Sequence, residues 1–233
     1  MKIDSQLPRM LDRAIQFSQI GALAVAIIST VWTLPAAGQT NDASLSQVSS
    51  RRARITQAID EKQLVSLHGN VHPQAHAKFD QGAVSDAQPL DRMLLLLQRA
   101  PEQEAALRQL LDDQLTLNSP KHHAWLTPQQ FGAQFGPTDA DLQATTNWLS
   151  AKGFHGIQVG PGRTVIEFSG TAGQVRDAFH TEIHSYVVNG AQHFANSSDP
   201  QIPAALAPVI AGVVSLHNFP KFAHSHKLGN FHR

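Results

Sequence analysis

Residues 153–186 read GFHGIQVGPGRTVIEFSGTAGQVRDAFHTEIHSY, and this stretch decides the fold. Residues 160–162 (GPG) separate two β-rich runs, which is the pattern of a hairpin. In the second run Ile166 and Phe168 alternate with Glu167, so one face of that strand is predicted to be buried. The stretch therefore begins as two strands joined by a tight turn.

A short helix and a third strand are predicted next. Residues 171–174 (TAGQ) have the form of a capping box, in which the threonine and glutamine side chains bond each other's backbone N–H groups. Val175, Ala178 and Phe179 then form one apolar stripe. Residues 183–188 return to a period of two. The β-β-α-β unit is half of a split β-α-β arrangement, so we predict an α+β, ferredoxin-like domain: an antiparallel sheet with helices packed on one face.

The remaining elements are predicted from the same signals. An apolar run makes residues 90–99 a strand, with its centre buried on both faces. Helices are expected from Pro101, with a leucine stripe at positions 107, 110, 111 and 115, from a capping box at residues 127–130, and from residues 138–141. Asn189-Gly190 predicts a second hairpin, and residues 209–216 a closing strand.

Composition excludes several classes of protein. The 233 residues are 42% hydrophobic and 15% charged, with zero net charge when histidine is neutral, which argues against a nucleic-acid surface. Cysteine is absent, so there are no disulfides and no thiolate chemistry. The 13 histidines would make the chain strongly positive between about pH 7 and pH 5.

Residues 1–38 are predicted to be a secretory signal peptide. A basic start precedes the uncharged run at residues 20–34, and small residues lead to a cleavage site between Gly38 and Gln39. The alternative is an uncleaved membrane anchor, but the run is shorter than the ~20 residues of a membrane-spanning helix. With the signal cleaved, the chain has no stable membrane span and is secreted or otherwise extracytoplasmic.

The rest of the chain divides into three predicted parts. Residues 39–63 are polar and aperiodic, as in a flexible linker. Residues 51–54 (RRAR) are either a processing site for a trypsin-like protease or a solvated charge run. Residues 64–220 form the domain, and the histidine-dotted residues 221–233 are expected to be a disordered tail.

An ordered set of short motifs runs through the predicted domain and carries a family resemblance. These motifs are Gly69–Pro73, Trp125–Pro128 with Phe131 and Phe135–Pro137, Trp148-Leu149, Gly153-Phe154, Phe168–Ala172, Ala178–His184, Ala195-Asn196, Asp199-Pro200, Ile202-Pro203 and Leu216–Phe219. From residue 64 to about residue 220 the chain closely resembles the pro-domain of the sedolisins, the serine-carboxyl peptidases that include kumamolisin.

This resemblance implies a domain that helps its protease fold, occupies the active-site cleft and is removed autocatalytically at acid pH. The family's Ser-Glu-Asp triad and calcium site belong to a catalytic domain, which we expect to be missing because the sequence ends at Arg233. We therefore predict no enzymatic activity, no catalytic residue and no cofactor here. Residues 169–171 (SGT) only superficially resemble the nucleophile motif. Phe219, Pro220 and Lys221 are the candidate processing junction.

Histidines are the candidate functional residues. His72 and His76 have zinc-ligand spacing, but the intervening proline breaks the helix that such a site uses, so no metal site is expected. His72, His180, His184 and His217 lie in the family-like motifs and are the candidates for a pH switch or a protease contact. The alternative is that they are exposed and titrate without consequence.

Two functions are therefore open. In the first, the chain is the pro-region of a secreted, acid-acting serine-carboxyl peptidase, serving as intramolecular chaperone and inhibitor. In the second, it is a free-standing secreted binding module or protease inhibitor that acts in trans. The expected partner is a sedolisin-type catalytic domain, in cis or in trans, and not a nucleic acid.

Overall fold

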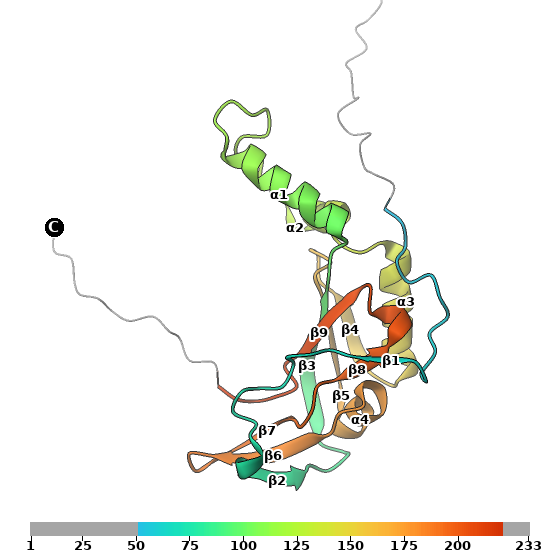
Figure 1. Cartoon of the computed structure of the whole chain (residues 1–233), viewed down its shortest axis with the longest axis vertical. Coiled ribbons are helices and arrows are strands. Elements are labelled where there is room, and N and C mark those ends of the chain that lie inside the picture. The colour runs from blue at the N-terminus through green and yellow to red at the C-terminus, as the bar shows by residue number, and fades with distance from the viewer. Residues whose placement is uncertain (1–50, 221–233) are drawn as a thin grey trace, which may run out of the picture. The chain divides into compact units, whose positions relative to one another are not determined.

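The computed structural model describes residues 51–220 (Figure 1). The predicted signal peptide with Gly38 and Gln39, the tail and Lys221 lie outside these residues. The central element is a four-stranded antiparallel sheet with the strand order β4-β5-β3-β9. Its strands are β3 (Pro89–Leu97), β4 (His155–Val159), β5 (Val165–Thr171) and β9 (Ile210–Val214).

The apolar run of the sequence forms β3, which lies between β5 and β9. Met93, Leu95 and Leu97 are buried, whereas the alternating Leu94 and Leu96 are only partly buried. The prediction of a central strand is confirmed. The prediction that it is buried on both faces is wrong, because helices cover one face and leave Leu94 and Leu96 on the other face partly exposed.

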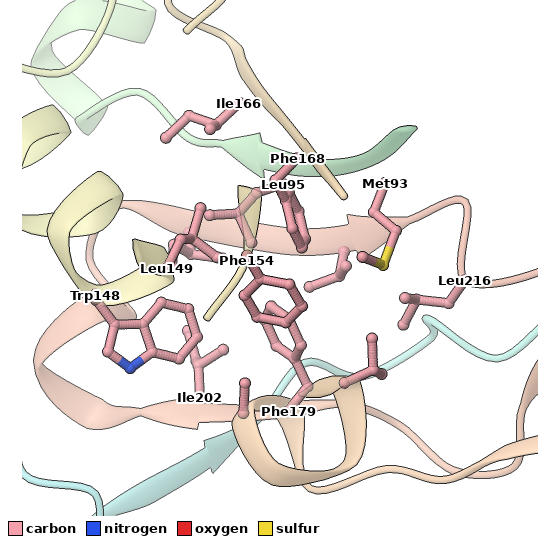
Figure 2. Close-up of a cluster of buried hydrophobic side chains, with 14 of the residues drawn as sticks. Met93, Leu95, Trp148, Leu149, Phe154, Ile166, Phe168, Phe179, Ile202 and Leu216 are labelled. Carbon is pink, nitrogen blue, oxygen red and sulfur yellow. The ribbon is translucent and has the colours of Figure 1, made fainter. Parts of the chain in front are cut away.

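Two helices supply the covered face, α3 (Asp139–Ala151) and α4 (Ala172–Phe179). Their buried side chains join those of β3 and β5 in one cluster (Figure 2). In it Trp148 meets Phe179 edge-on, with ring centroids 5.4 Å apart, and Phe154 meets Phe168 in the same manner at 5.0 Å. Packing of aromatic rings at these separations adds to the stabilisation from burial.

Both predicted capping boxes form, at residues 127–130 and 171–174, and the structure adds a third at residues 138–141, where a helix was expected to begin. In the box at residues 171–174, the Gln174 N–H donates to Oγ1 of Thr171 at 3.3 Å, and the Thr171 N–H donates to Oε1 of Gln174 at 2.8 Å. Gly153 has a φ of +84°, the left-handed conformation that commonly follows the end of a helix, here α3.

The helix predicted from Pro101 is α1 (Pro101–Leu115), which projects from the end of the sheet beside α2 (Pro128–Phe135) (Figure 1). Its leucine stripe is not a core stripe, since Leu111 is 49% and Leu115 74% exposed. Leu117 and Trp125, in the loop after α1, are also exposed. The periodicity of residues 101–115 predicted the helix correctly, but it did not predict that the leucines of the helix would be exposed.

The strand expected to complete the β-β-α-β unit belongs to another sheet. This strand, β6 (Ile183–Val188), pairs with β2 (Asp80–Ala83) and β7 (Ala191–Asn196). The predicted hairpin joins β6 to β7, with Asn189 and Gly190 at φ values of 53° and 79°. A third pairing joins β1 (Leu64–Ser66) to β8 (Gln201–Pro203), and the 3₁₀ turns are Ala77–Phe79 and Ala204–Leu206.

β9 pairs with β3 on the side opposite β5. A period of two identifies a strand but does not say which neighbour it pairs with, so the alternation of residues 183–188 could not show that β6 pairs with β2 and β7. The α+β class is confirmed. The narrower ferredoxin-like description stays a prediction. The relevant observation is the strand order β4-β5-β3-β9. In this order β5 lies between β4 and β3, which are joined through helices, and β3 lies between β5 and β9.

The described part of the predicted linker, residues 51–63, contacts the domain. The N–H groups of Arg54 and Ile55 donate to Oδ1 of Asp141, at 2.7 and 2.9 Å. The guanidinium of Arg54 donates to the carbonyl oxygen of Gln98 at 2.6 Å. Asp141 is fully buried, so this carboxylate links the start of α3 to a segment nearly 90 residues earlier in the chain.

Candidate functional site

The four histidines singled out by the sequence lie in three different surroundings. His180 ends α4 in the left-handed conformation, with a φ of 51°, and is exposed. His184 lies on β6, in contact with acidic side chains. His72 and His217, which are far apart in the sequence, come together beside Phe219 at the end of the domain.

Three imidazole rings surround Phe219, and we call the four residues His72, His193, His217 and Phe219 the histidine clasp. His72 and His193 both stack on the phenyl ring, with centroids 4.3 and 4.4 Å away. The His217 ring is 4.4 Å from that of His72 and 6.0 Å from that of Phe219. Phe219 is only 4% exposed. The structure therefore joins two pH-switch candidates to one residue of the candidate processing junction.

Hydrogen bonds hold the chain between these rings. The Asn218 N–H donates to the carbonyl oxygen of Phe194 on β7 at 3.2 Å, and the Phe194 N–H donates to Oδ1 of Asn218 at 2.8 Å. Below the clasp, Phe219 packs with Tyr186, Val188 and Ala195 of β6 and β7. The β6–β7 hairpin is thus the platform on which the end of the domain rests.

The neutral form of His72 fits this site better than the charged form. Partial burial, and next the nearby His193, lower the pKa of His72 from its ordinary value of 6.5. The Gln74 N–H donates to Nδ1 of His72 at 3.2 Å, so a proton on Nδ1 would remove the acceptor of that hydrogen bond.

This direction of shift fixes how His72 acts on stability. Because the pKa of His72 in the folded state lies below 6.5, the unfolded chain binds the proton more readily than the folded chain does. The contribution of His72 is therefore present above about pH 6.5 and is lost as the pH falls below it. Acid therefore removes the contribution that neutral His72 makes.

His184 has the opposite behaviour. Its Nδ1 lies 2.8 Å from a carboxylate oxygen of Asp80 on β2, and its Nε2 lies 3.2 Å from Glu182. Burial opposes the charge, but the hydrogen bonds to Asp80 and Glu182 outweigh it, so the pKa of His184 is raised above 6.5. Its contribution is complete below about pH 6.5 and is lost as the pH rises through the raised value. We call Asp80, Glu182 and His184 the β2–β6 acid pair.

The pKa of Asp80 sets the lower end of the pH range in which this interaction stabilises the fold. Burial disfavours its charged form, but the Gly82 N–H and His184 outweigh burial and lower the pKa of Asp80 below 3.8. The aspartate contributes stability above about pH 3.8, and this contribution is lost as the pH falls through the lowered pKa. The β2–β6 acid pair is therefore strongest between the two ordinary values, 3.8 and 6.5.

Among residues 51–220, Ser169 and His184 do not come together as a nucleophile and a base. Ser169 lies on β5, where its Oγ accepts the Arg92 N–H at 3.1 Å, whereas His184 lies in the other sheet between carboxylates. Within residues 51–220 no group of three metal-ligating side chains is suitably placed for an ion. In the same residues no helix is long and apolar enough to cross a membrane.

Sequence reasoning missed His193 and Asn218. His193 lies in the short strand after the hairpin turn, which carried no signal of a site. Its position opposite Tyr186 follows from the register of the hairpin once the turn is known. Nothing in the sequence places it against Phe219. A hollow of about 450 Å³ adjoins the clasp and shares His217 and Asn218 with it; its wall also includes Leu90, Arg92, Leu94, Glu167 and Phe194.

Comparison with known proteins identifies the domain. Residues 77–219, more than half of the chain, match the family described as "Pro-kumamolisin, activation domain". Xanthomonalisin of Xanthomonas sp. (strain T-22) is 35% identical over 130 residues, which are 56% of this chain and 15% of that protein. Sedolisin of Pseudomonas sp. (strain 101) is 36% identical over 115 residues, or 49% and 20%. The chain thus spans no more than a fifth of these relatives, and it belongs to the pro-kumamolisin activation-domain family.

Proposed function

We propose that this chain is the pro-region of a secreted, acid-acting serine-carboxyl peptidase, which it helps to fold, inhibits and leaves at low pH. The observation that carries the proposal is the family match, which covers the domain from residue 77 to Phe219. The chain itself would have no catalytic activity. Secretion follows from the predicted signal peptide and would give a mature chain that begins at Gln39, which N-terminal sequencing of the exported protein checks.

The proposed partner is a sedolisin-type catalytic domain, and the uncovered face of the four-stranded sheet is the proposed contact. Leu94 and Leu96 of β3, Val165 of β5 and Val214 of β9 alternate with core residues, and all four are only partly buried. Glu167 lies opposite Leu94 on the same face, and an exposed apolar patch bordered by polar residues marks an interaction site more often than an isolated exposed residue does.

The proposal is tested by titrating a purified mature sedolisin-type peptidase with the full chain from pH 6.5 to pH 3. We expect inhibition near pH 6.5 that weakens as the pH falls, because partly buried histidines of the clasp become charged. The Leu94→Asp variant should inhibit at least tenfold more weakly, equivalent to about 1.4 kcal/mol. Leu115→Asp, on exposed α1, is the control and should inhibit like the parent chain.

The outcomes separate the parts of the proposal. If a chain shown to be folded by circular dichroism inhibits at no pH, the inhibitor role is wrong. If it inhibits equally at every pH, inhibition stands and acid release is wrong.

The second candidate is a free-standing module that acts in trans on another exported protein. It is favoured by the extensive core of residues 51–220, in which Phe168, Phe179 and Leu149 are fully buried without any partner chain. Failure to inhibit the peptidase, with the chain folded, would favour this function over the first.

A further inference from the structure

We propose that acid opens the histidine clasp locally and frees the segment around Phe219, while the β2–β6 acid pair keeps the rest of the domain folded. The inference deepens the proposed function, on which its consequence for the peptidase rests. The opening itself is a property of this chain and needs no partner.

Geometry makes the clasp the part that acid disturbs. His72 and His193 stack on the same phenyl ring, and His217 lies 4.4 Å from His72. Protonation places several positive charges around one buried ring and removes the acceptor that Nδ1 of His72 offers to the Gln74 N–H. Like charges that close to one another disfavour the closed arrangement.

The two histidines that stack on Phe219 have no carboxylate beside them to offset this repulsion. The acidic groups of the neighbouring hollow, Asp91 and Glu167, line it beside His217, and Glu167 binds Arg92 at 3.1 and 3.3 Å. The 3₁₀ turn under the clasp carries His76 and Lys78, both potential cations, and β6 carries Tyr186. Within residues 51–220 neither His72 nor His193 forms an ion pair with a carboxylate.

The platform responds to acid in the other direction. Protonated His184 lies between Asp80 and Glu182, so the same fall in pH strengthens the link between β2 and β6. Because β6 also carries Tyr186 and Val188, on which Phe219 packs, the platform stays in place while its cover opens. The two histidine sites together convert acid into local release and not into unfolding.

The test follows single backbone amides of the full chain by NMR hydrogen exchange at pH 7 and pH 4.5, corrected for intrinsic exchange. We expect the amides of Asn218 and Phe194, which hold the segment, to lose at least tenfold of their protection at pH 4.5. Amides of β3 and β5 should keep theirs. Unchanged protection of Asn218, or its loss together with β3 and β5, would overturn the proposal.

Variants assign the effect to the named residues. His72→Asn with His193→Gln keeps an acceptor for the Gln74 N–H but takes up no proton, so Asn218 protection at pH 4.5 should return to within twofold of its pH 7 value. The control His180→Asn replaces an exposed histidine at a left-handed position that asparagine tolerates, and should change nothing. Acid loss of Asn218 protection that persists in the double variant would contradict the role of the two histidines.

The His184→Gln variant tests whether the β2–β6 acid pair keeps the domain folded in acid. In this variant acid should melt β3 and β5 together with the clasp, at a higher pH than in the parent chain, as followed by circular dichroism. An unchanged acid midpoint would show that the β2–β6 acid pair does not protect the fold. If the double variant does not fold, histidine NMR titration of the parent decides, with His72 titrating below and His184 above 6.5.

These measurements use no peptidase. A chain that opens as described but inhibits nothing would leave the clasp mechanism standing and remove the proposed function. A chain that inhibits the peptidase but shows no local opening would leave the proposed function standing and remove the clasp mechanism.

Discussion

Replacing Phe179 with alanine is expected to lower the free energy of unfolding by about 3–5 kcal/mol. Phe179 closes α4 and is fully buried. Its ring lies 5.4 Å from that of Trp148, 5.8 Å from Phe154 and 6.0 Å from Phe168 (Figure 2). The substitution therefore leaves a cavity at the point where α3, α4 and the sheet meet, and a rigid aromatic cluster cannot collapse to fill it.

The measurement is urea unfolding of the full chain at pH 7. A domain of this size has a stability of about 5–15 kcal/mol, so the variant should lose about a fifth of it or more. Leu115→Ala removes a similar apolar side chain that is 74% exposed, and it should change stability by less than about 0.5 kcal/mol. A Phe179→Ala loss no larger than that of the control would mean that the aromatic cluster is not the centre of the core.

Replacing Asp141 with alanine is expected to cost about 3 kcal/mol and to detach residues 51–55 from the domain. The buried carboxylate accepts the N–H groups of Arg54 and Ile55 with Oδ1, and the Thr138 hydroxyl at 2.7 Å with Oδ2. A hydrogen bond to a charged group contributes about 1.5–3 kcal/mol, and loss of a helix cap about 1 kcal/mol. These contributions share one carboxylate, so they are not additive.

Two readouts distinguish this effect from a general loss of structure. Urea unfolding gives the change in stability, and trypsin digestion at pH 7 should cut the variant after Arg54 much faster than the parent chain. The matched control is Asp139→Ala, two residues earlier on the same helix, whose exposed carboxylate pairs with Arg163 at 2.7 Å. An exposed ion pair contributes less than about 1 kcal/mol. Equal protection at Arg54 in parent and D141A would refute the anchoring role.

Most of the local structure could be predicted from the sequence because its causes are local. The capping boxes at Thr127, Thr138 and Thr171 act over three residues, and the turn at Asn189-Gly190 over two. Both signals are complete within a few residues of chain. The same holds for β3, whose apolar run identifies it as a central strand before any partner is known.

The pairing of strands and the exposure of α1 could not be predicted in the same way. Residues 183–188 alternate as a strand in any sheet, and only their pairing with β2 and β7 assigns them to the second one. The leucines of α1 repeat with a helical period whether or not a neighbour covers them. Periodicity describes one element, whereas burial depends on two.

The candidate site, too, could be predicted only in part from the sequence. The sequence by itself determined the family-like motifs, the α+β class and the choice of His72, His180, His184 and His217 as titrating candidates. Only the tertiary structure decided that His72 and His217 meet at Phe219, that His193 joins them, and that His184 lies between Asp80 and Glu182. The physical reason is that a histidine's pKa shifts with burial and with charges a few ångströms away, and here those neighbours come from segments more than 100 residues apart in the chain.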